Sequence, residues 1–272
     1  AYRKIKSADR LESLIDSLGH AEGTKYLFID EIQNVEDFEE VVNAYRGTGE
    51  YSVFITGSNS YLLSGELVTK LTGRYVEFEL FPLSFDEYLD MKAFLGKEVN
   101  ANLLIELNNY LQEGGFPKAM QYDDFADKRT YVRSVIDEIF EKDIKRRVKV
   151  RNVETFNNVR NFIINNFGAT VSVKSLQEAL AKNGIELKHA TLSRYIEVLL
   201  QSKILYQCDR FDMKSKRALS GEKKYYLADI SFYFATNTDN RINYGPALEN
   251  MVYVYAKSLD YSVSAGRIGK LE

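Results

Sequence analysis

One stretch constrains the fold more than any other: Tyr26-Leu27-Phe28-Ile29-Asp30-Glu31-Ile32-Gln33, an apolar run that ends in two adjacent carboxylates. A continuous apolar run of this length is typical of a strand buried on both faces of a parallel sheet. In open α/β sheets, ligands bind at the carboxyl edge of such strands. There Asp30 would hold Mg²⁺ and Glu31 would orient or deprotonate a water molecule. The alternative interpretation is a buried strand that ends in a solvated acidic turn.

The next segments predict a second strand beside the first. Residues 7–18 and 36–46 repeat apolar residues at helical spacing, and Tyr51-Ser52-Val53-Phe54-Ile55-Thr56 is a second apolar strand. Strand, helix and strand form a βαβ unit, which brings the second strand's end to the Asp30–Glu31 edge. Because this end continues as Gly57-Ser58-Asn59-Ser60, we predict a site for phosphate and metal. The alternative is an ordinary polar turn.

Helices dominate the part that follows. Ser84 and Glu87 form a capping-box pattern at the start of one of them. A third strand is expected over 75–80, and helices are expected over 61–72, 85–94, 101–112, 116–122 and 126–147. An all-helical block behind an α/β core suggests a lid.

Charge is distributed unevenly along the chain, although the net charge is only −3. Residues 1–141 hold 14 Lys or Arg against 26 Asp or Glu, whereas residues 142–225 hold 18 against 8. A basic segment of this kind indicates a domain with an anionic partner, or a face that docks on the acidic half.

The basic segment has the pattern of a winged helix-turn-helix. Helices are predicted over 152–167, 172–181 and 189–202, and strands over 204–209 and 223–227. The start of the third helix and the wing carry the candidate DNA contacts: Lys188, His189, Thr191, Ser193, Arg194, Arg210, Lys214, Lys216 and Arg217. Many winged helices only pack against protein, so DNA binding and protein packing both stay open.

The C-terminal part predicts a helix over 246–259 and strands over 261–265 and 269–272. Glu249 on the helix is either a metal-binding carboxylate or a solvated side chain. The single cysteine, Cys208, allows no intramolecular disulfide and is expected to pack as a small apolar residue. No apolar run of 18 residues occurs, so we expect no membrane span, and the cytoplasm is the default location.

Together these stretches resemble a family of prokaryotic AAA-type ATP-binding proteins. The matching segments keep their order along nearly the whole chain: Tyr26 to Gln33 (the Walker B strand), Ile55-Thr56-Gly57-Ser58-Asn59-Ser60, Leu71-Thr72-Gly73-Arg74-Tyr75, Phe81-Pro82-Leu83-Ser84-Phe85, Gly114-Gly115-Phe116-Pro117, Tyr226-Leu227-Ala228-Asp229 and Leu248-Glu249-Asn250. The resemblance implies an α/β fold in four parts. These are a parallel-sheet P-loop ATPase core over 1–83, a helical lid over 84–150, a winged helix over 151–228, and the start of a restriction-endonuclease-like α/β domain over 229–272.

The same resemblance implies roles for single residues. Asp30 would coordinate Mg²⁺, Glu31 would activate the attacking water, and Ser58 or Asn59 would sense the γ-phosphate of ATP. Arg74 would stabilise charge, in cis or across a subunit boundary, which would imply a homo-oligomer. In the nuclease-like part, the acidic positions would be Glu249 and Glu272.

One element of the family is absent from the sequence. A Gly-x-x-x-x-Gly-Lys-Ser/Thr loop, which cradles the phosphates, occurs nowhere in these residues. Either the loop lies outside these residues, or this member of the family has lost it. We expect the first, a fragment that binds ATP weakly or not at all. The leading hypothesis is an ATPase, with ATP and Mg²⁺ as cofactors, that couples nucleotide state to the winged helix. The rivals are a regulator that binds double-stranded DNA and a metal-dependent nuclease.

Overall fold

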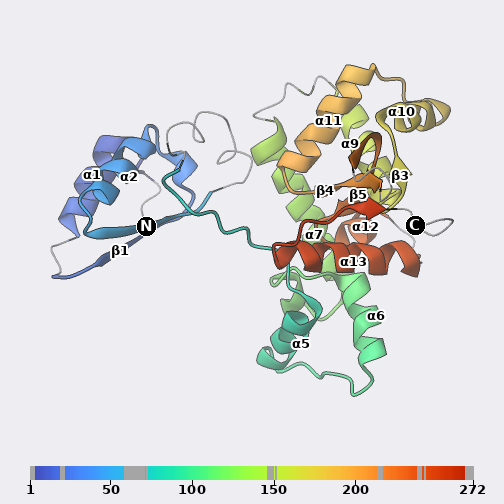
Figure 1. Cartoon of the computed structure of the whole chain (residues 1–272). Coiled ribbons are helices and arrows are strands. Elements are labelled where there is room, and N and C mark those ends of the chain that lie inside the picture. Colours follow the sequence, from blue (N-terminus) through green and yellow to red (C-terminus); the bar gives the residue numbers. More distant parts are fainter. Residues whose placement is uncertain are drawn as a thin grey trace. The chain divides into compact units, whose positions relative to one another are not determined.

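The computed structural model describes residues 4–18, 22–57, 71, 73–145, 150, 152–212, 217–237, 241 and 243–266. The chain forms two compact units, residues 1–78 and 79–272 (Figure 1). Among the described residues, no helix combines the length and apolar character that a membrane-spanning segment requires.

Unit 1 contains the predicted βαβ element. Its elements are α1 (Ala8–Ser17), β1 (Lys25–Ile29), the 3-10 turn η1 (Ile32–Asn34), α2 (Phe38–Gly47) and β2 (Tyr51–Ile55). Strands β1 and β2 are parallel, with Ile29 opposite Ile55. Leu11, Ile15, Phe38 and Val41 from the two helices pack with buried Ile32 in one core. The predicted α/β arrangement with parallel strands is confirmed.

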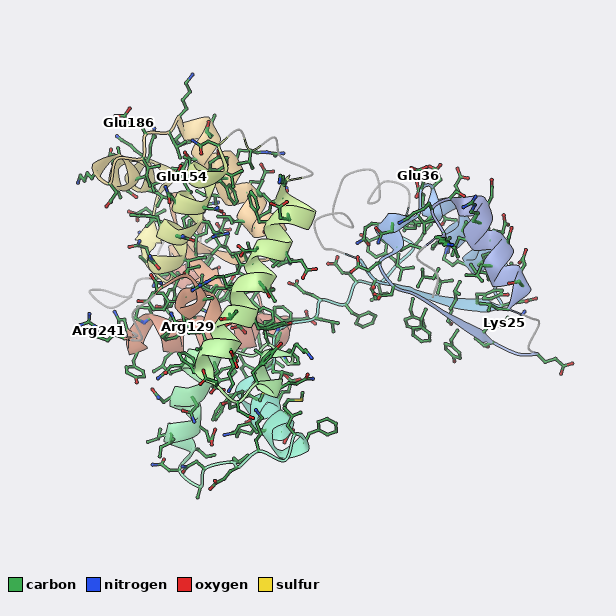
Figure 2. All side chains as sticks on the ribbon, turned by 180° about the vertical axis from the view of Figure 1, so that it is seen from behind. Lys25, Glu36, Arg129, Glu154, Glu186 and Arg241 are labelled. Carbon is green, nitrogen blue, oxygen red and sulfur yellow. The ribbon has the colours of Figure 1, made fainter. Side chains whose placement is uncertain are left out.

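The expectation that the first strand is buried on both faces is wrong. Helices α1 and α2 lie on one face of the two strands, in both views of the molecule (Figures 1 and 2). On the other face Tyr26 and Phe28 are 66% and 72% exposed, and the ring of Phe28 stacks on that of Phe54 at 4.7 Å. An apolar run specifies that a strand forms, but it does not specify what covers each face.

Unit 2 is mostly helical, with a four-stranded sheet. Its elements are α5 (Phe85–Phe94), α6 (Leu103–Glu113), η2 (Ala119–Gln121), α7 (Phe125–Ile139), the π-helical turn η3 (Phe140–Ile144), α9 (Val153–Asn165), β3 (Thr170–Val171), α10 (Val173–Lys182), α11 (His189–Gln201), β4 (Leu205–Asp212), β5 (Arg217–Leu227), α12 (Ser231–Thr236), α13 (Tyr244–Ser258) and β6 (Ala265–Gly266). The strand order is β3-β5-β4-β6, with β4 and β5 antiparallel and β6 parallel to β4.

Several predicted elements after residue 60 differ from the structure. Residues 75–80 form no strand: Val76, Phe78 and Leu80 alternate as expected, but no described strand pairs with them and all three are exposed. The helix expected over 116–122 is only the short turn η2, and only Ala265 of the strand expected over 261–265 is in β6. The sequence reading missed β3 and α12. Apart from Leu71, the helix predicted over 61–72 and the strand over 269–272 lie outside the described residues.

One hydrophobic core runs through unit 2. It joins helices from the expected lid to the expected winged helix and to α13, as seen in Leu111, Ile136, Phe156, Leu227 and Tyr253. Cys208 is buried in this core, as predicted. The expected lid and the helices that follow it are therefore packed together.

A buried carboxylate links three distant segments of this unit. The side chain of Asp229 is 4% exposed and accepts hydrogen bonds from the N–H groups of Gly115 at 2.7 Å and Ser231 at 2.8 Å. The N–H of Leu83 in turn donates to the carbonyl of Gly115 at 2.8 Å. Burial raises the pKa of Asp229 although these hydrogen bonds oppose the shift. We call this set, Leu83, Gly114, Gly115, Asp229 and Ser231, the Asp229 node.

Candidate functional site

The carboxyl edge of β1 and β2 holds the two predicted carboxylates. Because Ile29 and Ile55 are opposite each other, Asp30 and Thr56 follow at the same edge. The Thr56 hydroxyl donates a hydrogen bond to Asp30 Oδ1 and accepts one from the N–H of Glu31 at 3.2 Å. The N–H of Ile32 donates to the Thr56 carbonyl at 3.0 Å. Thr56 therefore fixes both the Asp30 side chain and the backbone of the turn that follows it.

A left-handed residue turns the chain at this edge. Glu31 has φ 55° and ψ 44°, a conformation that costs a non-glycine residue about 1–2 kcal/mol. Its carbonyl accepts hydrogen bonds from the Asn34 N–H and from Asn34 Nδ2, each at 3.0 Å. Its carboxylate accepts a hydrogen bond from Gln33 Nε2. Strained backbone of this kind is concentrated at functional sites.

The edge suits one kind of cation site. Asp30 and Glu31 are both exposed and offer hard oxygen ligands. Mg²⁺ is commonly held by one or two carboxylates, with water and substrate phosphates completing its coordination. The described residues contain no cluster of three or more His, Cys, Asp or Glu that would form an all-protein metal cage. The residues present therefore fit the metal-and-water part of an ATP site, whereas the phosphate-cradling loop is absent from the sequence.

The other predicted nucleotide-site residues are not brought to this edge within the described residues. Arg74 is exposed, and its side chain makes no hydrogen bond or ion pair with Asp30 or Glu31. Ser58 and Asn59 lie outside the described residues. Their expected roles stay predictions.

The sequence reading missed Thr56 and Gln33 as side chains that contact the carboxylates. Thr56 had a detectable signal, because it follows the second strand just as Asp30 follows the first. Gln33 had none, because its contact with Glu31 depends on the 3-10 turn η1.

The candidate DNA-contacting residues lie on α11 and the β4–β5 hairpin. Lys188 is the exposed residue just before α11, and Thr191 is half-buried in the first turn. Arg194 is exposed but pairs with Glu197 on the same helix at 2.8 Å. On the hairpin, Arg210 pairs with Glu222. These two ion pairs neutralise part of the basic charge within the fold. Lys216 lies outside the described residues.

Glu249, the candidate nuclease-like acid, is held by the hairpin. Its Oε1 accepts hydrogen bonds from Lys224 Nζ at 2.8 Å and from the Tyr226 hydroxyl at 2.6 Å. The next residue, Asn250, bonds through its side-chain amide to both the N–H and the carbonyl of Leu227, at 2.7 and 2.9 Å. Burial raises the pKa of Tyr226, and the bond to Glu249 adds to the shift. This contact docks α13 on β5; Glu272 lies outside the described residues.

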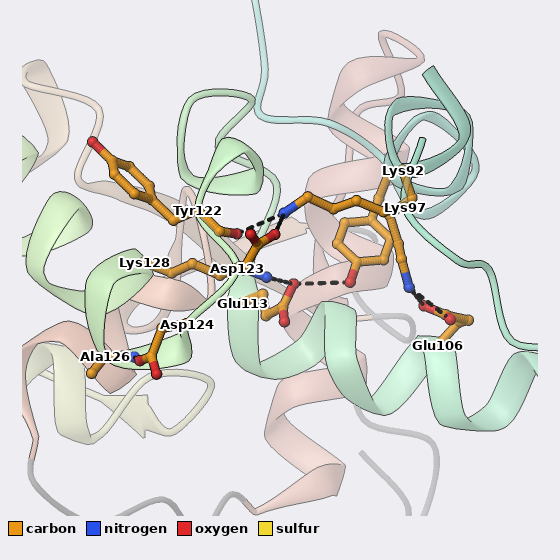
Figure 3. Close-up of polar contacts among 10 residues, drawn as sticks. Lys92, Lys97, Glu106, Glu113, Tyr122, Asp123, Asp124, Ala126 and Lys128 are labelled. Carbon is orange, nitrogen blue, oxygen red and sulfur yellow. Dashed lines mark hydrogen bonds and ion pairs between the residues drawn. The ribbon is translucent and has the colours of Figure 1, made fainter. Parts of the chain in front are cut away.

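A charged cavity of about 320 Å³ lies between α5, α6 and α7. Three lysines border it, each paired with a carboxylate (Figure 3): Lys92 with Glu106 at 2.7 Å, Lys97 with Asp123 at 2.6 Å and Lys128 with Glu113 at 2.7 Å. Burial raises the pKa of Glu106, but hydrogen bonds from Lys92 and the Asn100 N–H outweigh it and leave the pKa below its usual range. The Lys92–Glu106 pair joins α5 to α6 and the Lys128–Glu113 pair joins α7 to α6, whereas the Lys97–Asp123 pair joins two loops.

Comparisons with known proteins agree with the geometry of unit 1. Residues 2–89 match a family described as an AAA domain, and residues 104–241 match a domain of unknown function (DUF8612). Among solved structures, a Walker-type ATPase of Pyrococcus abyssi matches 87% of this chain and 68% of its own, with a TM-score of 0.50 and 15% identity. At that identity the likeness concerns the fold alone. Residues 2–89 are therefore similar to an AAA domain, which agrees with the parallel α/β arrangement of unit 1.

Two curated relatives extend the match. An uncharacterized protein of Haemophilus influenzae is 32% identical over 273 residues, which cover 100% of this chain and 67% of that protein. Another, from Methanocaldococcus jannaschii, is 32% identical over 251 residues, which cover 90% of this chain and 56% of that protein. The chain belongs to the family of the domain of unknown function (DUF8612), here preceded by an AAA domain.

Proposed function

We propose that the full-length gene product is an Mg²⁺-dependent ATPase whose AAA domain uses the Asp30–Glu31 edge. The observation that carries this proposal is the arrangement of Asp30, Glu31 and Thr56 at the carboxyl ends of two parallel strands. A deep all-protein metal cage would suggest a structural ion, whereas two exposed carboxylates leave coordination positions for phosphate and water.

Each edge residue has a distinct role in this proposal. Asp30 holds Mg²⁺, and the Thr56 hydroxyl fixes the orientation of its carboxylate. Glu31 accepts a proton from the attacking water. When bound, Mg²⁺ supplies positive charge that neutralises the phosphate oxygens. Ser58, Asn59 and Arg74 are the further candidates for contacts to the γ-phosphate.

We further propose that unit 2 is the part that responds to nucleotide. Three helices, α9, α10 and α11, followed by the β4–β5 hairpin match the order of a winged helix. The short strand β3 pairs with β5 in the antiparallel direction and forms one edge of this small sheet. An ATP-dependent change would thereby reposition α11 and the basic β4–β5 hairpin.

The test is nucleotide binding and hydrolysis by the full-length gene product, with and without Mg²⁺. Glu31→Gln should keep nucleotide binding and lose about 10²–10⁴-fold in kcat, because the general base is removed. Asp30→Asn should weaken Mg²⁺-dependent binding. Glu36→Gln is the matched control, since this exposed carboxylate lies close in sequence but outside the edge. Absence of nucleotide binding, or full activity of Glu31→Gln, would refute the proposal.

The second candidate is a regulator that binds double-stranded DNA through α11 and the hairpin, with the α/β unit as a scaffold. Exposed Lys188 just before α11 favours it, and the ion pairs of Arg194 and Arg210 weaken it. A nuclease is a third alternative, although Glu249 is already bonded to Lys224 and Tyr226.

A further inference from the structure

Gln33 contacts the carboxylate that the proposed function needs most. It lies in the turn η1 and is half-buried, and its Nε2 donates a hydrogen bond to Glu31 Oε2. No hydrogen bond from the described residues reaches the other carboxylate oxygen, Oε1. One oxygen of Glu31 is therefore held by protein, and the other is available to a water molecule.

The opposite end of the Gln33 amide is costly to the fold. Its Oε1 is buried and has no hydrogen-bond partner among the described residues. The amide cannot be reversed to relieve this, because an ionised carboxylate only accepts hydrogen bonds and needs the N–H₂ group. A buried carbonyl without a partner destabilises the native state. The Gln33 side chain thus donates a hydrogen bond to Glu31 while its own carbonyl oxygen stays without a partner. A local conflict of this kind is expected at functional sites.

We propose that Gln33 is a positioning residue for Glu31 in ATP hydrolysis, an inference that rests on the proposed function. The left-handed turn at Glu31 points the side chain away from the strand direction, and its carboxylate would otherwise rotate in solvent. The Gln33 hydrogen bond restricts that rotation. It selects the orientation in which Oε1 faces the reacting water.

The test compares two substitutions that each remove a buried amide oxygen without a partner. Gln33→Met keeps about the same side-chain length and removes both polar groups of the amide, the carbonyl oxygen and the NH₂. Asn43→Leu does the same on α2, where the Asn43 oxygen is also buried without a partner among the described residues. Neither should lower the melting temperature of the full-length gene product, because each removes an unsatisfied group.

Only Gln33→Met should change catalysis. We expect its kcat to fall about 10- to 100-fold with KM and nucleotide affinity unchanged, because a misplaced base affects the chemical step. Asn43→Leu should keep the wild-type kcat. Glu31→Gln in the same assay separates the two levels of the argument: if it hydrolyses ATP like wild type, the proposed function fails.

With Glu31→Gln inactive, three results would overturn the role of Gln33. The first is a wild-type kcat for Gln33→Met, and the second is a raised KM of Gln33→Met with an unchanged kcat. The third is a fall in the kcat of Gln33→Met together with equal falls in the melting temperatures of Gln33→Met and Asn43→Leu. A kcat loss confined to Gln33→Met, with its melting temperature maintained, would support the proposal.

Discussion

Substitution of Gly114 by alanine tests how firmly the Asp229 node is packed. Gly114 ends α6 with φ 76° and ψ −170°, a region open almost only to glycine. A Cβ at this position would lie 1.9 Å from Asp229 Oδ1 and 2.7 Å from Ser231 Cβ. The new methyl group therefore requires both a strained backbone and displacement of the buried carboxylate.

The expected loss in the free energy of unfolding is the sum of two contributions, one from the backbone conformation and one from the displaced carboxylate. The backbone conformation costs about 1–3 kcal/mol for alanine. Moving the Asp229 carboxylate breaks at least one hydrogen bond to a charged group, about 1.5–3 kcal/mol. We expect Gly114→Ala to lower the free energy of unfolding by about 2.5–6 kcal/mol, a large part of the 5–15 kcal/mol typical of proteins.

Urea unfolding monitored by circular dichroism measures this loss, with two glycine variants as controls. Gly96 has φ +68°, and no atom lies within 4 Å of a Cβ added there. Gly96→Ala should therefore lower the free energy of unfolding by only about 1–2 kcal/mol, the cost of the left-handed backbone. Gly115→Ala has no left-handed φ, but its Cβ would lie 2.3 Å from the Leu83 carbonyl oxygen. It isolates the effect of close packing. Equal losses for Gly114→Ala and Gly96→Ala would refute the idea that the node is rigid.

Two further predictions concern charged side chains. Glu106→Gln should destabilise the protein by about 3 kcal/mol at pH 7, because the half-buried Lys92 is left without its carboxylate. Since the pKa of Glu106 is lowered in the fold, this stabilisation is lost as the pH falls through that pKa. The difference in melting temperature from wild type should therefore narrow as the pH falls below the usual pKa of a glutamate side chain, and a difference that stays constant would contradict this explanation. If DNA binds α11, Lys188→Gln should reduce the salt dependence of duplex binding by about one unit of log–log slope. Arg194→Gln should reduce it less because of the Glu197 pair; equal slopes, measured by fluorescence anisotropy, would count against this.

Helices were the elements that the sequence predicted best, for a local physical reason. The helix expected over 85–94 is observed as α5, with Ser84 and Glu87 forming both bonds of the capping box. Each of those contacts spans three residues, so the sequence contains all the information required. The π-helical turn η3 was not predicted, because no comparable local pattern marks it.

Strands were less predictable because their partners lie elsewhere in the chain. The parallel pairing of β1 and β2 followed from two apolar runs around a helix, and it places Asp30 and Thr56 at the same edge, as the sequence predicted for the two strand ends. Residues 75–80 have the alternation of a strand, yet no described strand pairs with them. The contact of Thr56 with Asp30 required the register of two strands, which the sequence does not state directly.

The Asp229 node gives a structural reason for three of the segments that carry the family resemblance, although they lie far apart in the sequence. Phe81-Pro82-Leu83-Ser84-Phe85, Gly114-Gly115-Phe116-Pro117 and Tyr226-Leu227-Ala228-Asp229 meet there, since Gly115 bonds to both Leu83 and Asp229. Glycine is needed at 114 and 115 because a Cβ would strike the carboxylate or the Leu83 backbone. The node joins the segments flanking α5 and α6 to the end of β5. A movement of α5 and α6 must therefore carry β5 with it or break this buried carboxylate's hydrogen bonds. On this argument, a nucleotide signal reaching the helices of unit 2 would be passed directly to the hairpin.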